Sequence, residues 1–173
     1  MAITGPESTG KSTLSNQLAK YYQTVSTDEY ARSFLDSLER PYEKKDLLEI
    51  ANGQIREENS KQLAANRLLF CDTDLLVIKI WSEYKYGSLD PKILSEIGKR
   101  NYDIYLLTNI DLPWKYDIQR EHPDKRAYFF NLFQKELKSI HANYHIIQGE
   151  NDQRLKSAVK VIDAFTSQLQ DEQ

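Results

Sequence analysis

Apolar and polar residues follow one another along this chain in blocks that predict strands separated by helices. Continuous apolar or β-branched runs of strand length occur within residues 1–4, 24–27, 68–74, 102–108 and 144–149. The segments between them carry apolar residues at three- and four-residue spacing, which is typical of amphipathic helices. Because strands and helices alternate throughout, the pattern predicts an α/β fold with a parallel five-stranded sheet flanked by helices.

Helical periodicity also predicts where the helices lie. They are expected at 11–22, from 28 to the break at Pro41, and at 42–67, 74–86, 91–100, 127–143 and 151–169. Local residue types explain three of these boundaries. Asp28 is suited to cap the second helix, Gly87 to end the fourth, and Pro91 to begin the next one.

Gly53 interrupts the long third helix, whose other residues are good helix formers. Glycine in a helix interior costs about 1 kcal/mol relative to alanine, so its presence needs a cause. The close approach of a ligand or of a neighbouring helix would supply one. Gln54, the next residue, is then expected to contact a polar group of the substrate.

Length and composition restrict the class of protein. The 173 residues suit one domain, spanning 1–173, that is large enough to bury a core. The formal net charge of -3 provides no basic field, so nucleic acid is not an expected partner. The one cysteine, Cys71, rules out an internal disulfide, fits a reducing compartment, and is expected to be buried in a strand.

The most apolar stretch, residues 67–81, contains Asp72 and Asp74. This stretch cannot cross a bilayer without burying charge, and no basic start leads into an apolar run as in a secretory signal. The sequence therefore predicts a cytoplasmic protein that binds small molecules and does not contact a membrane, and it leaves protein partners open.

Residues 5–12 read GPESTGKS and match the phosphate-binding loop, or Walker A, pattern G-x-x-x-x-G-K-[ST] in full. An apolar strand precedes the loop and an amphipathic helix follows it, so the backbone N–H groups can form a phosphate site. Lys11 is expected to reach the terminal phosphates and the Ser12 hydroxyl to bind Mg²⁺. The predicted contacts of the nucleotide in this loop are Gly5, Glu7, Ser8, Thr9, Gly10, Lys11, Ser12 and Thr13.

The acids after the third predicted strand are candidates for the metal and the acceptor. Asp72 ends a buried strand at the carboxyl edge of the sheet, where ligands bind in open α/β folds. Asp72 is therefore the second predicted ligand of Mg²⁺, and Asp74 is expected to face the acceptor substrate. Capping of the following helix is the structural alternative for both acids.

The polar, proline-containing segment 109–126 is long enough to form a lid, whose expected extent is approximately 112–127. Phosphoryl transfer requires charge neutralisation and the exclusion of water, and a closing segment that carries arginines provides both. Arg120 and Arg126 are the candidates for nucleotide contact, with a solvated surface position as the alternative for each.

A phosphate loop alone does not define a reaction. A GTPase would carry Asn-Lys-x-Asp after a late strand, whereas TNID at 108–111 has the wrong spacing and lacks the lysine. Motor and switch ATPases normally have larger domains, and this length is that of a small-molecule kinase. The sequence therefore favours a kinase, and a nucleotide-binding regulatory module without turnover is the alternative from another class.

A kinase of hydroxyl groups also needs a carboxylate near the acceptor oxygen. Asp28 and Glu29 follow the second strand on the expected substrate side, and Arg32 lies within one helical turn of both. Glu29 is the residue predicted to orient the acceptor hydroxyl and to take up its proton, with Asp74 as the second candidate.

Several selective motifs occur together and in order: GPESTGKSTL, DEYAR, ANGQIREE, CDTD and DLPWKYDIQRE. From residue 3 to about 165, the chain resembles the ribosylnicotinamide kinase domain of the NadR-type proteins of bacterial NAD metabolism. The resemblance implies a fold similar to nucleoside monophosphate kinases. It also implies transfer of the γ-phosphate of ATP to the 5′-hydroxyl of nicotinamide riboside, which gives nicotinamide mononucleotide. NadR-type proteins carry an upstream adenylyltransferase domain as well, which these 173 residues do not include.

Carried over position by position, the resemblance implies roles for individual residues. It puts Lys11 and Ser12 on ATP and Mg²⁺, Glu29, Tyr30 and Arg32 near the acceptor, Asp72 and Asp74 at the metal and the ribose, and Trp114, Asp117 and Arg120 in the lid. The family lid commonly reads P-W-x-D-D-G-x-R, and Tyr116 and Ile118 depart from that pattern here. Another nucleoside or a nucleoside monophosphate is the alternative acceptor, for which Arg32 and Arg56 are the available arginines.

The cationic ring of nicotinamide riboside suits an aromatic face flanked by acids. The aromatic candidates are Tyr30, Trp81, Tyr84 and Trp114, each of which can equally pack in the core. Glu7 is the unusual member of the phosphate loop, because a bare carboxylate against a triphosphate is repelled. We expect Glu7 to point away from the phosphates, toward Arg32, Arg120 or the acceptor, with a solvent-facing turn position as the alternative.

Overall fold

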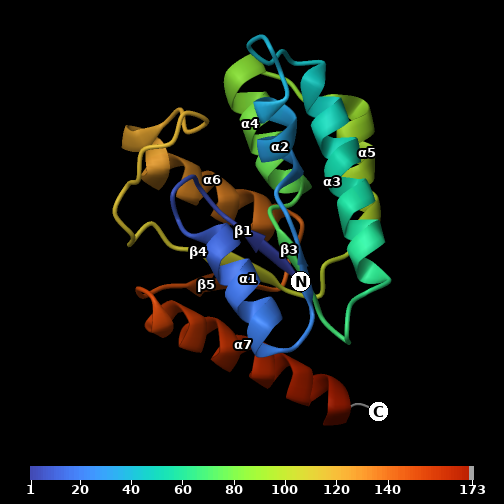
Figure 1. Ribbon diagram of the computed structural model, residues 1–173, viewed down its shortest axis with the longest axis vertical. Helices are drawn as coiled ribbons and strands as arrows, with labels where there is room; N and C mark the ends of the chain where they lie inside the picture. Colours follow the sequence, from blue (N-terminus) through green and yellow to red (C-terminus); the bar gives the residue numbers. More distant parts are fainter. Residues whose placement is uncertain (172–173) are drawn as a thin grey trace.

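Five parallel strands form one sheet in the order β2-β3-β1-β4-β5 (Figure 1) in the computed structural model, which describes the backbone of residues 1–171 and the side chains of residues 1–169. The strands are β1 (Ala2–Thr4), β2 (Val25–Thr27), β3 (Leu69–Asp72), β4 (Tyr105–Thr108) and β5 (Tyr144–Ile147). Each strand lies inside a segment that the apolar pattern predicted. The parallel five-stranded α/β sheet is therefore confirmed.

The central strand β1 explains why the chain uses continuous apolar runs. Ala2 and Ile3 are fully buried, and β1 pairs with β3 on one side and with β4 on the other. A strand that is covered on both faces must be apolar at successive positions. The edge strand β5 differs, since its residues His145 and Ile146 are exposed.

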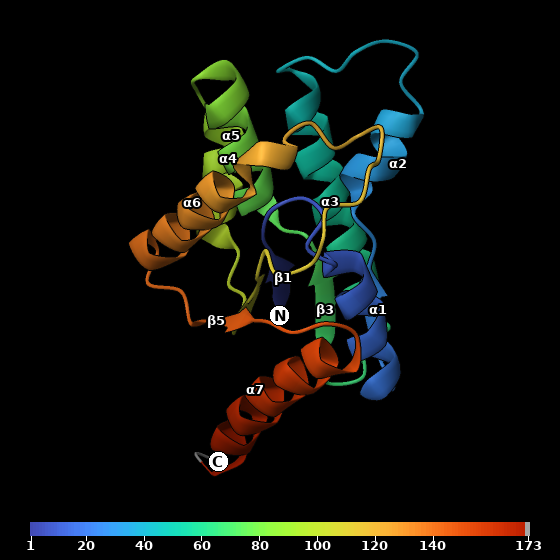
Figure 2. The ribbon, with the colours of Figure 1, turned by 90° about the vertical axis from the view of Figure 1, so that its left-hand side faces the viewer.

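Helices cover both faces of the sheet. They are α1 (Lys11–Tyr21), α2 (Tyr30–Asp36), α3 (Asp46–Gln62), α4 (Leu75–Tyr86), α5 (Pro91–Lys99), α6 (Arg126–Ser139) and α7 (Asp152–Asp171), with a 3-10 turn at Pro123–Lys125. Helices α1 and α7 pack on one face through an apolar cluster that includes Leu18 and Ile162, and α4 and α6 pack on the other face. Figure 2 shows both layers.

A third apolar cluster joins the helices α2, α3, α4 and α5 to one another. Ile50 of α3 and Ile78 of α4 are among its buried members. Figure 2 shows these helices extending past the sheet on the side of the loop that follows β1. They therefore form a wall beside the carboxyl edge of the sheet, where the predicted site residues lie.

Two helices begin two or more residues later than predicted. Helix α2 begins at Tyr30 with Glu29 as its N-cap residue, so Asp28 does not cap it. Helix α3 begins at Asp46 rather than at 42. The Asp46 carboxylate accepts a hydrogen bond of 2.7 Å from the N–H of Glu43, and this contact fixes a turn ahead of the helix.

The predicted end of α4 and start of α5 are confirmed. Gly87 follows α4 with a φ of 67°, in the left-handed region that glycine adopts without strain. Pro91 occupies the first position of α5, and the side chain of Asp90 accepts a hydrogen bond of 2.8 Å from the N–H of Lys92.

Cys71 is buried in β3, as expected. Burial raises the pKa of its thiol to about 12, so the thiol stays protonated at neutral pH. The residue therefore serves as a small apolar side chain within the sheet.

None of the helices within residues 1–171 combines the length and the apolar character that crossing a lipid bilayer requires. The cytoplasmic location expected from the sequence stays a prediction.

The close contact expected at Gly53 is made by a side chain of α2. A Cβ atom at Gly53 would lie 2.0 to 2.3 Å from atoms of the Tyr30 ring, so the ring packs directly against the backbone of α3. Arg56 lies over the same ring, 5.9 Å from its centroid. The cause of the helical glycine is therefore a neighbouring helix rather than a ligand, and the contact fixes the start of α2 against α3.

We expect Gly53→Ala to destabilise the protein by about 1 to 3 kcal/mol, because the added methyl group displaces the Tyr30 ring. The displacement should outweigh the gain in helix propensity, which is about 1 kcal/mol. Thermal or urea unfolding measures the effect. Gly98→Ala is the matched control, since a Cβ atom at Gly98 in α5 meets open space. That control should be neutral or stabilising, and equal effects of the two substitutions would contradict the packing argument.

Candidate active site

Two glycines shape the loop between β1 and α1. Gly5 has a φ of 138°, and a Cβ atom there would lie 2.6 Å from Oγ1 of Thr108. Gly10 precedes α1 with a φ of 79°, a backbone conformation that residues with a Cβ atom rarely adopt. The loop therefore turns tightly over the end of β4 and presents its backbone and the start of α1 to one side, as a phosphate-binding loop requires.

Polar contacts beneath the loop maintain this shape. Thr9 Oγ1 donates to the carbonyl oxygen of Pro6 at 2.8 Å and lies 2.7 Å from Oγ1 of Thr108. Arg154 of α7, which is 4% exposed, donates to the carbonyl oxygen of Thr9 at 2.8 Å and pairs with Asp111. A buried guanidinium is costly unless it is paired, and these oxygens satisfy it. Arg154 was not among the residues predicted from the sequence.

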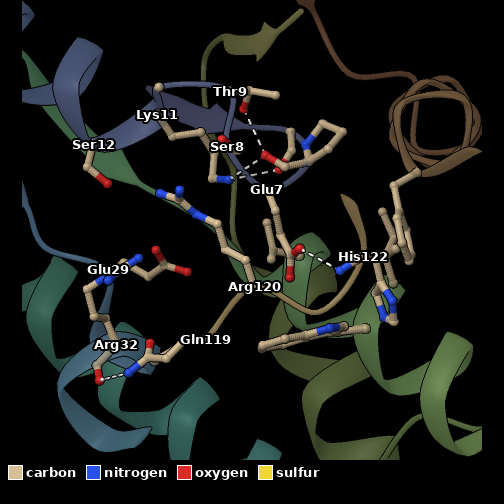
Figure 3. A pocket seen from close by; sticks show the side chains of 18 of the residues that line it. Glu7, Ser8, Thr9, Lys11, Ser12, Glu29, Arg32, Gln119, Arg120 and His122 are labelled. Atoms are coloured by element: carbon tan, nitrogen blue, oxygen red, sulfur yellow. Dashed lines mark hydrogen bonds between the residues drawn. The ribbon is translucent and has the colours of Figure 1, made fainter. Parts of the chain in front are cut away.

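A cavity of about 190 Å³ opens beside the loop (Figure 3). Its lining includes twelve of the predicted residues: Gly5, Glu7, Ser8, Thr9, Gly10, Lys11, Ser12, Thr13, Glu29, Arg32, Trp81 and Arg120. The rest of the lining is Pro6, Ala31, Leu35, Val77, Ile80, Gln119, His122, Phe129 and Phe133. The fold thus brings to one place the loop, the start of α2, the apolar sides of α4 and α6, and segment 112–127, which is termed the lid after its predicted role.

Lys11 and Arg120 bring positive charge to the loop side of this cavity. Lys11 Nζ lies 3.0 Å from the carbonyl oxygen of Gly5 and 2.9 Å from that of Pro6. Figure 3 shows Arg120 extending from the lid toward Lys11 and Ser12. Two cations next to a row of backbone N–H groups form a suitable binding site for a polyphosphate.

The carboxylate of Asp72 lies at the buried end of β3, next to Ser12. Burial raises its pKa to about 6, while the nearby Ser12 hydroxyl and the charge of Lys11 oppose the shift. Its Oδ1 atom has no hydrogen-bond partner among the described residues. A buried carboxylate oxygen that lacks a partner needs an explanation, and a divalent cation held together with the hydroxyl provides one. Asp72 and Ser12 therefore fit Mg²⁺.

The described residues contain no cluster of three or more acidic, histidine or cysteine side chains that could hold a metal ion by itself. Mg²⁺ does not require such a cluster, because it is usually bound by one or two protein oxygens together with water and substrate phosphates. The pair of Ser12 and Asp72 is in keeping with that mode.

Asp74 points into the core instead of the cavity. It is fully buried and accepts a hydrogen bond of 2.9 Å from the Thr4 hydroxyl. Thr73, between the two acids, has a φ of 73°, which is rare for a β-branched residue. This turn accompanies the separation of the two carboxylates, so that Asp72 lies near the loop and Asp74 lies under β1. The structure therefore does not place Asp74 with the other predicted acceptor residues.

Glu29 and Arg32 line the cavity at the start of α2. Arg32 donates to the Asp117 carboxylate of the lid at 2.9 Å, and not to an acid of its own helix. Gln119 adds a hydrogen bond of 2.6 Å to Asp36. Asp117 itself does not line the cavity. Its contact with Arg32 fastens the lid to α2.

Gln54 lies behind the cavity and is 2% exposed. Its Oε1 accepts a hydrogen bond of 3.0 Å from the N–H of Tyr30, and its Nε2 donates to the carbonyl oxygen of Asp72 at 3.4 Å. Because both ends of the amide contact the backbone, Gln54 holds the start of α2 near the end of β3. Tyr30 and Trp114 are likewise outside the cavity lining, and Trp114 lies half-buried in the lid.

The two lid arginines have different surroundings. Arg120 lines the cavity and donates to the carbonyl oxygen of Lys115 at 2.5 Å. Arg126 lies outside the lining and is held by three backbone carbonyl oxygens. Arg126 donates to those of Ile110 at 2.7 Å, of Leu112 at 2.7 Å and of Ser8 at 3.2 Å. Arg126 therefore connects the two ends of the lid to the phosphate loop, and its guanidinium does not line the cavity.

Glu7 contacts the lid backbone. Its carboxylate oxygens accept hydrogen bonds from the N–H of Glu121 at 3.3 Å and from the N–H of His122 at 3.2 Å. Figure 3 marks the contact with His122. Its partner is therefore neither Arg32 nor Arg120. Glu7 is half-buried, so a solvent-facing turn position does not describe it either.

Comparisons with known proteins agree with this site. A family model described as AAA domain matches residues 1–154. The trifunctional NAD biosynthesis/regulator protein NadR of Salmonella typhimurium is 28% identical over 172 residues, which cover 94% of this chain and 41% of that protein. This chain thus spans less than half the length of that relative. The resemblance to NadR-type proteins is confirmed.

Two solved structures share the fold. The crystal structure of NadR in complex with NAD and AMP-PNP has a TM-score of 0.80 at 21% identity, over 95% of this chain and 48% of that chain. The crystal structure of NadR in complex with NR has a TM-score of 0.81 at 20% identity, over 95% of this chain and 50% of that chain. Together with the sheet order, these similarities confirm the predicted P-loop kinase type of fold.

The substitution Asp74→Asn is expected to stabilise the protein at neutral pH. Burial raises the pKa of Asp74 from 3.8 to about 7, so the folded state binds the proton more tightly than the unfolded state. Protonated Asp74 therefore contributes to the free energy of unfolding. This contribution is fully present below about pH 4 and is lost as pH rises through the folded-state pKa of about 7. An asparagine does not ionise, so the variant should exceed wild type by about 2 to 4 kcal/mol at pH 8 and differ little at pH 4.

Thermal unfolding between pH 4 and pH 8, without metal or nucleotide, measures this difference. Asp124→Asn, which changes an exposed aspartate, serves as the control and should follow wild type. A variant that is less stable than wild type at pH 8 would show that the charged form of Asp74 supports the fold.

Proposed function

We propose that this chain, which belongs to the AAA-domain family, is an ATP- and Mg²⁺-dependent kinase of nicotinamide riboside. The 5′-hydroxyl oxygen forms a bond to the γ-phosphorus of ATP while the bond from that phosphorus to the bridging oxygen breaks. ADP leaves, the hydroxyl proton is released, and nicotinamide mononucleotide forms. One relative and two solved structures support this choice. The relative is a NAD biosynthesis/regulator protein, and the NadR structures contain AMP-PNP with NAD in one and NR in the other.

One observation carries the proposal: Glu29 and the phosphate loop line the same cavity, and Arg120 reaches into the space between them (Figure 3). A γ-phosphate on the loop and a hydroxyl group at Glu29 would meet in a space that the lid covers. Holding both reactants in line, with water excluded, accounts for most of the catalysis in phosphoryl transfer.

Within this arrangement each residue has a defined task. Lys11 exchanges the carbonyl oxygens of Gly5 and Pro6 for the terminal phosphates of ATP. Arg120 neutralises negative charge on the group being transferred, and Glu29 orients the acceptor hydroxyl and accepts its proton. Because the lid is fastened to α2 and to the loop, it keeps water away from the reacting phosphate.

Ser12 and Asp72 would hold Mg²⁺. The partnerless Oδ1 of Asp72 and the adjacent hydroxyl of Ser12 support this assignment. The bound ion supplies positive charge at the β- and γ-phosphates. With a cation nearby, the Asp72 carboxylate would stay ionised below its present pKa of about 6.

The rest of the cavity indicates the class of acceptor. Its far wall is apolar and aromatic, consisting of Val77, Ile80, Trp81, Phe129 and Phe133. Such a wall suits a planar base or pyridinium ring, and the acids Glu7 and Glu29 in the same cavity favour a cationic ring.

A nucleoside monophosphate is a less suitable acceptor, because its phosphate would need cationic partners at the acceptor end. Arg32 is engaged with Asp117. Arg56 lies over the Tyr30 ring and outside the cavity lining. The charge distribution therefore favours an acceptor that does not yet carry a phosphate.

Release of ADP from ATP tests the function with nicotinamide riboside, the common nucleosides and their monophosphates supplied one at a time. We expect nicotinamide riboside to give the highest kcat/KM, at least about tenfold above the next acceptor. A higher kcat/KM for another nucleoside or for a monophosphate would assign that compound as the acceptor instead. Nucleotide binding without stimulation by any acceptor would support a regulatory module instead of a kinase.

Glu29→Gln should lower kcat by about 100-fold or more, because the amide cannot accept the hydroxyl proton. The affinity for ATP should change little, since Glu29 belongs to the start of α2 and not to the phosphate loop. Asp28→Asn is the matched control. It changes the neighbouring acid, which is exposed and outside the cavity lining, and should keep near wild-type turnover. If Glu29→Gln turns over at the wild-type rate, another group performs this role.

A further inference from the structure

The phosphate loop and the lid are joined by two adjacent loop residues, Glu7 and Ser8. The Glu7 carboxylate accepts hydrogen bonds from the N–H groups of Glu121 and His122. Ser8 Oγ accepts a hydrogen bond of 2.8 Å from the N–H of Lys115. The loop thus holds the lid on both sides of Arg120, the lid residue that points into the cavity.

We propose that Glu7 is a positioning residue of phosphoryl transfer, which holds the lid segment 120–122 closed so that Arg120 stays directed at the transferred phosphate. The proposal rests on the proposed kinase function. Glu7 itself does not contact the reacting atoms. It acts through the hydrogen bonds that its carboxylate accepts from the two backbone N–H groups.

Charge explains why a glutamate in this loop favours a closed lid. Glu7 lines the same cavity as Lys11 and lies within the loop expected to hold the triphosphate. In the closed arrangement both carboxylate oxygens are satisfied by lid N–H groups, and such bonds to an ionised acceptor are strong. Opening of the lid would leave the carboxylate facing the phosphates, which it repels. Bound nucleotide should therefore stabilise the closed lid.

Other contacts hold the lid at sites away from the loop. The Glu121 carboxylate lies 3.1 Å from Lys85 Nζ and accepts a hydrogen bond of 3.3 Å from Tyr42. Those contacts fix the lid to α4 and to the segment before α3, and the pair of Arg32 and Asp117 fixes it to α2. None of these segments belongs to the phosphate loop. The Glu7 contact differs because it belongs to the nucleotide loop. It can therefore couple nucleotide occupancy to lid closure, and the coupling must be reciprocal.

Hydrogen exchange of the Glu121 and His122 amides tests the proposal without any acceptor. In wild type, AMP-PNP with Mg²⁺ should slow the exchange of both amides by about tenfold or more. Glu7→Ala should abolish this slowing, and Glu7→Gln, whose side-chain oxygen accepts but carries no charge, should keep only part of it. Glu39→Ala, at an exposed glutamate, is the control and should match wild type. Equal slowing in wild type and Glu7→Ala would overturn the proposal.

Kinetics provides a second measurement on the same variants. Glu7→Ala should lower acceptor-dependent kcat by about tenfold and raise the ratio of ATP hydrolysis to transfer, because an open lid admits water. The KM for ATP should stay within about threefold, and Glu7→Gln should lie between the two proteins. A purely structural role would leave the ratio of hydrolysis to transfer unchanged. If no acceptor is phosphorylated, the proposed function fails, while the exchange experiment still decides whether Glu7 holds the lid.

Discussion

The close approach of the phosphate loop to the end of β4 is the contact on which the rest of the site depends. It is possible only because Gly5 lacks a side chain, and Thr9, Thr108 and Arg154 fix it from below. With the loop in this position, the first turn of α1 presents Lys11 and Ser12 to the cavity and brings Ser12 next to Asp72. The parallel sheet matters for function mainly because it brings these chain segments together at its carboxyl edge.

Negative charge is the second constraint, because a site for triphosphate must keep its carboxylates from repelling the substrate. Each acid is handled in a different way. Asp72 is buried with a partnerless oxygen that a cation can satisfy. Glu7 is engaged with lid N–H groups, and Asp74 is directed into the core. Glu29 is then the acid on the side of the cavity where a hydroxyl acceptor is proposed to bind.

Most of the fold could be predicted from the sequence because its signals are local. Apolar runs located the strands, and the contiguous loop motif located the phosphate site. The missed features depend on contacts between distant residues or on one backbone angle. The bond from His122 to Glu7 spans 115 positions, and Arg154 reaches Asp111 over 43. The Asp74 side chain turns into the core where the backbone of Thr73 has a positive φ. The N-cap residue of α2 is Glu29 and not Asp28, and residue preferences do not locate a helix start to within one position.

In the proposed reaction, the γ-phosphate of ATP is transferred in this cavity to a ribose hydroxyl. Phosphorus NMR of the protein with ATP, Mg²⁺ and nicotinamide riboside follows that phosphorus directly. We expect the γ-phosphate signal to disappear as a phosphomonoester signal grows at an equal rate, with coupling to the two 5′ protons of the product. Inorganic phosphate as the sole product, or an unchanged γ-phosphate signal, would show that this transfer does not occur.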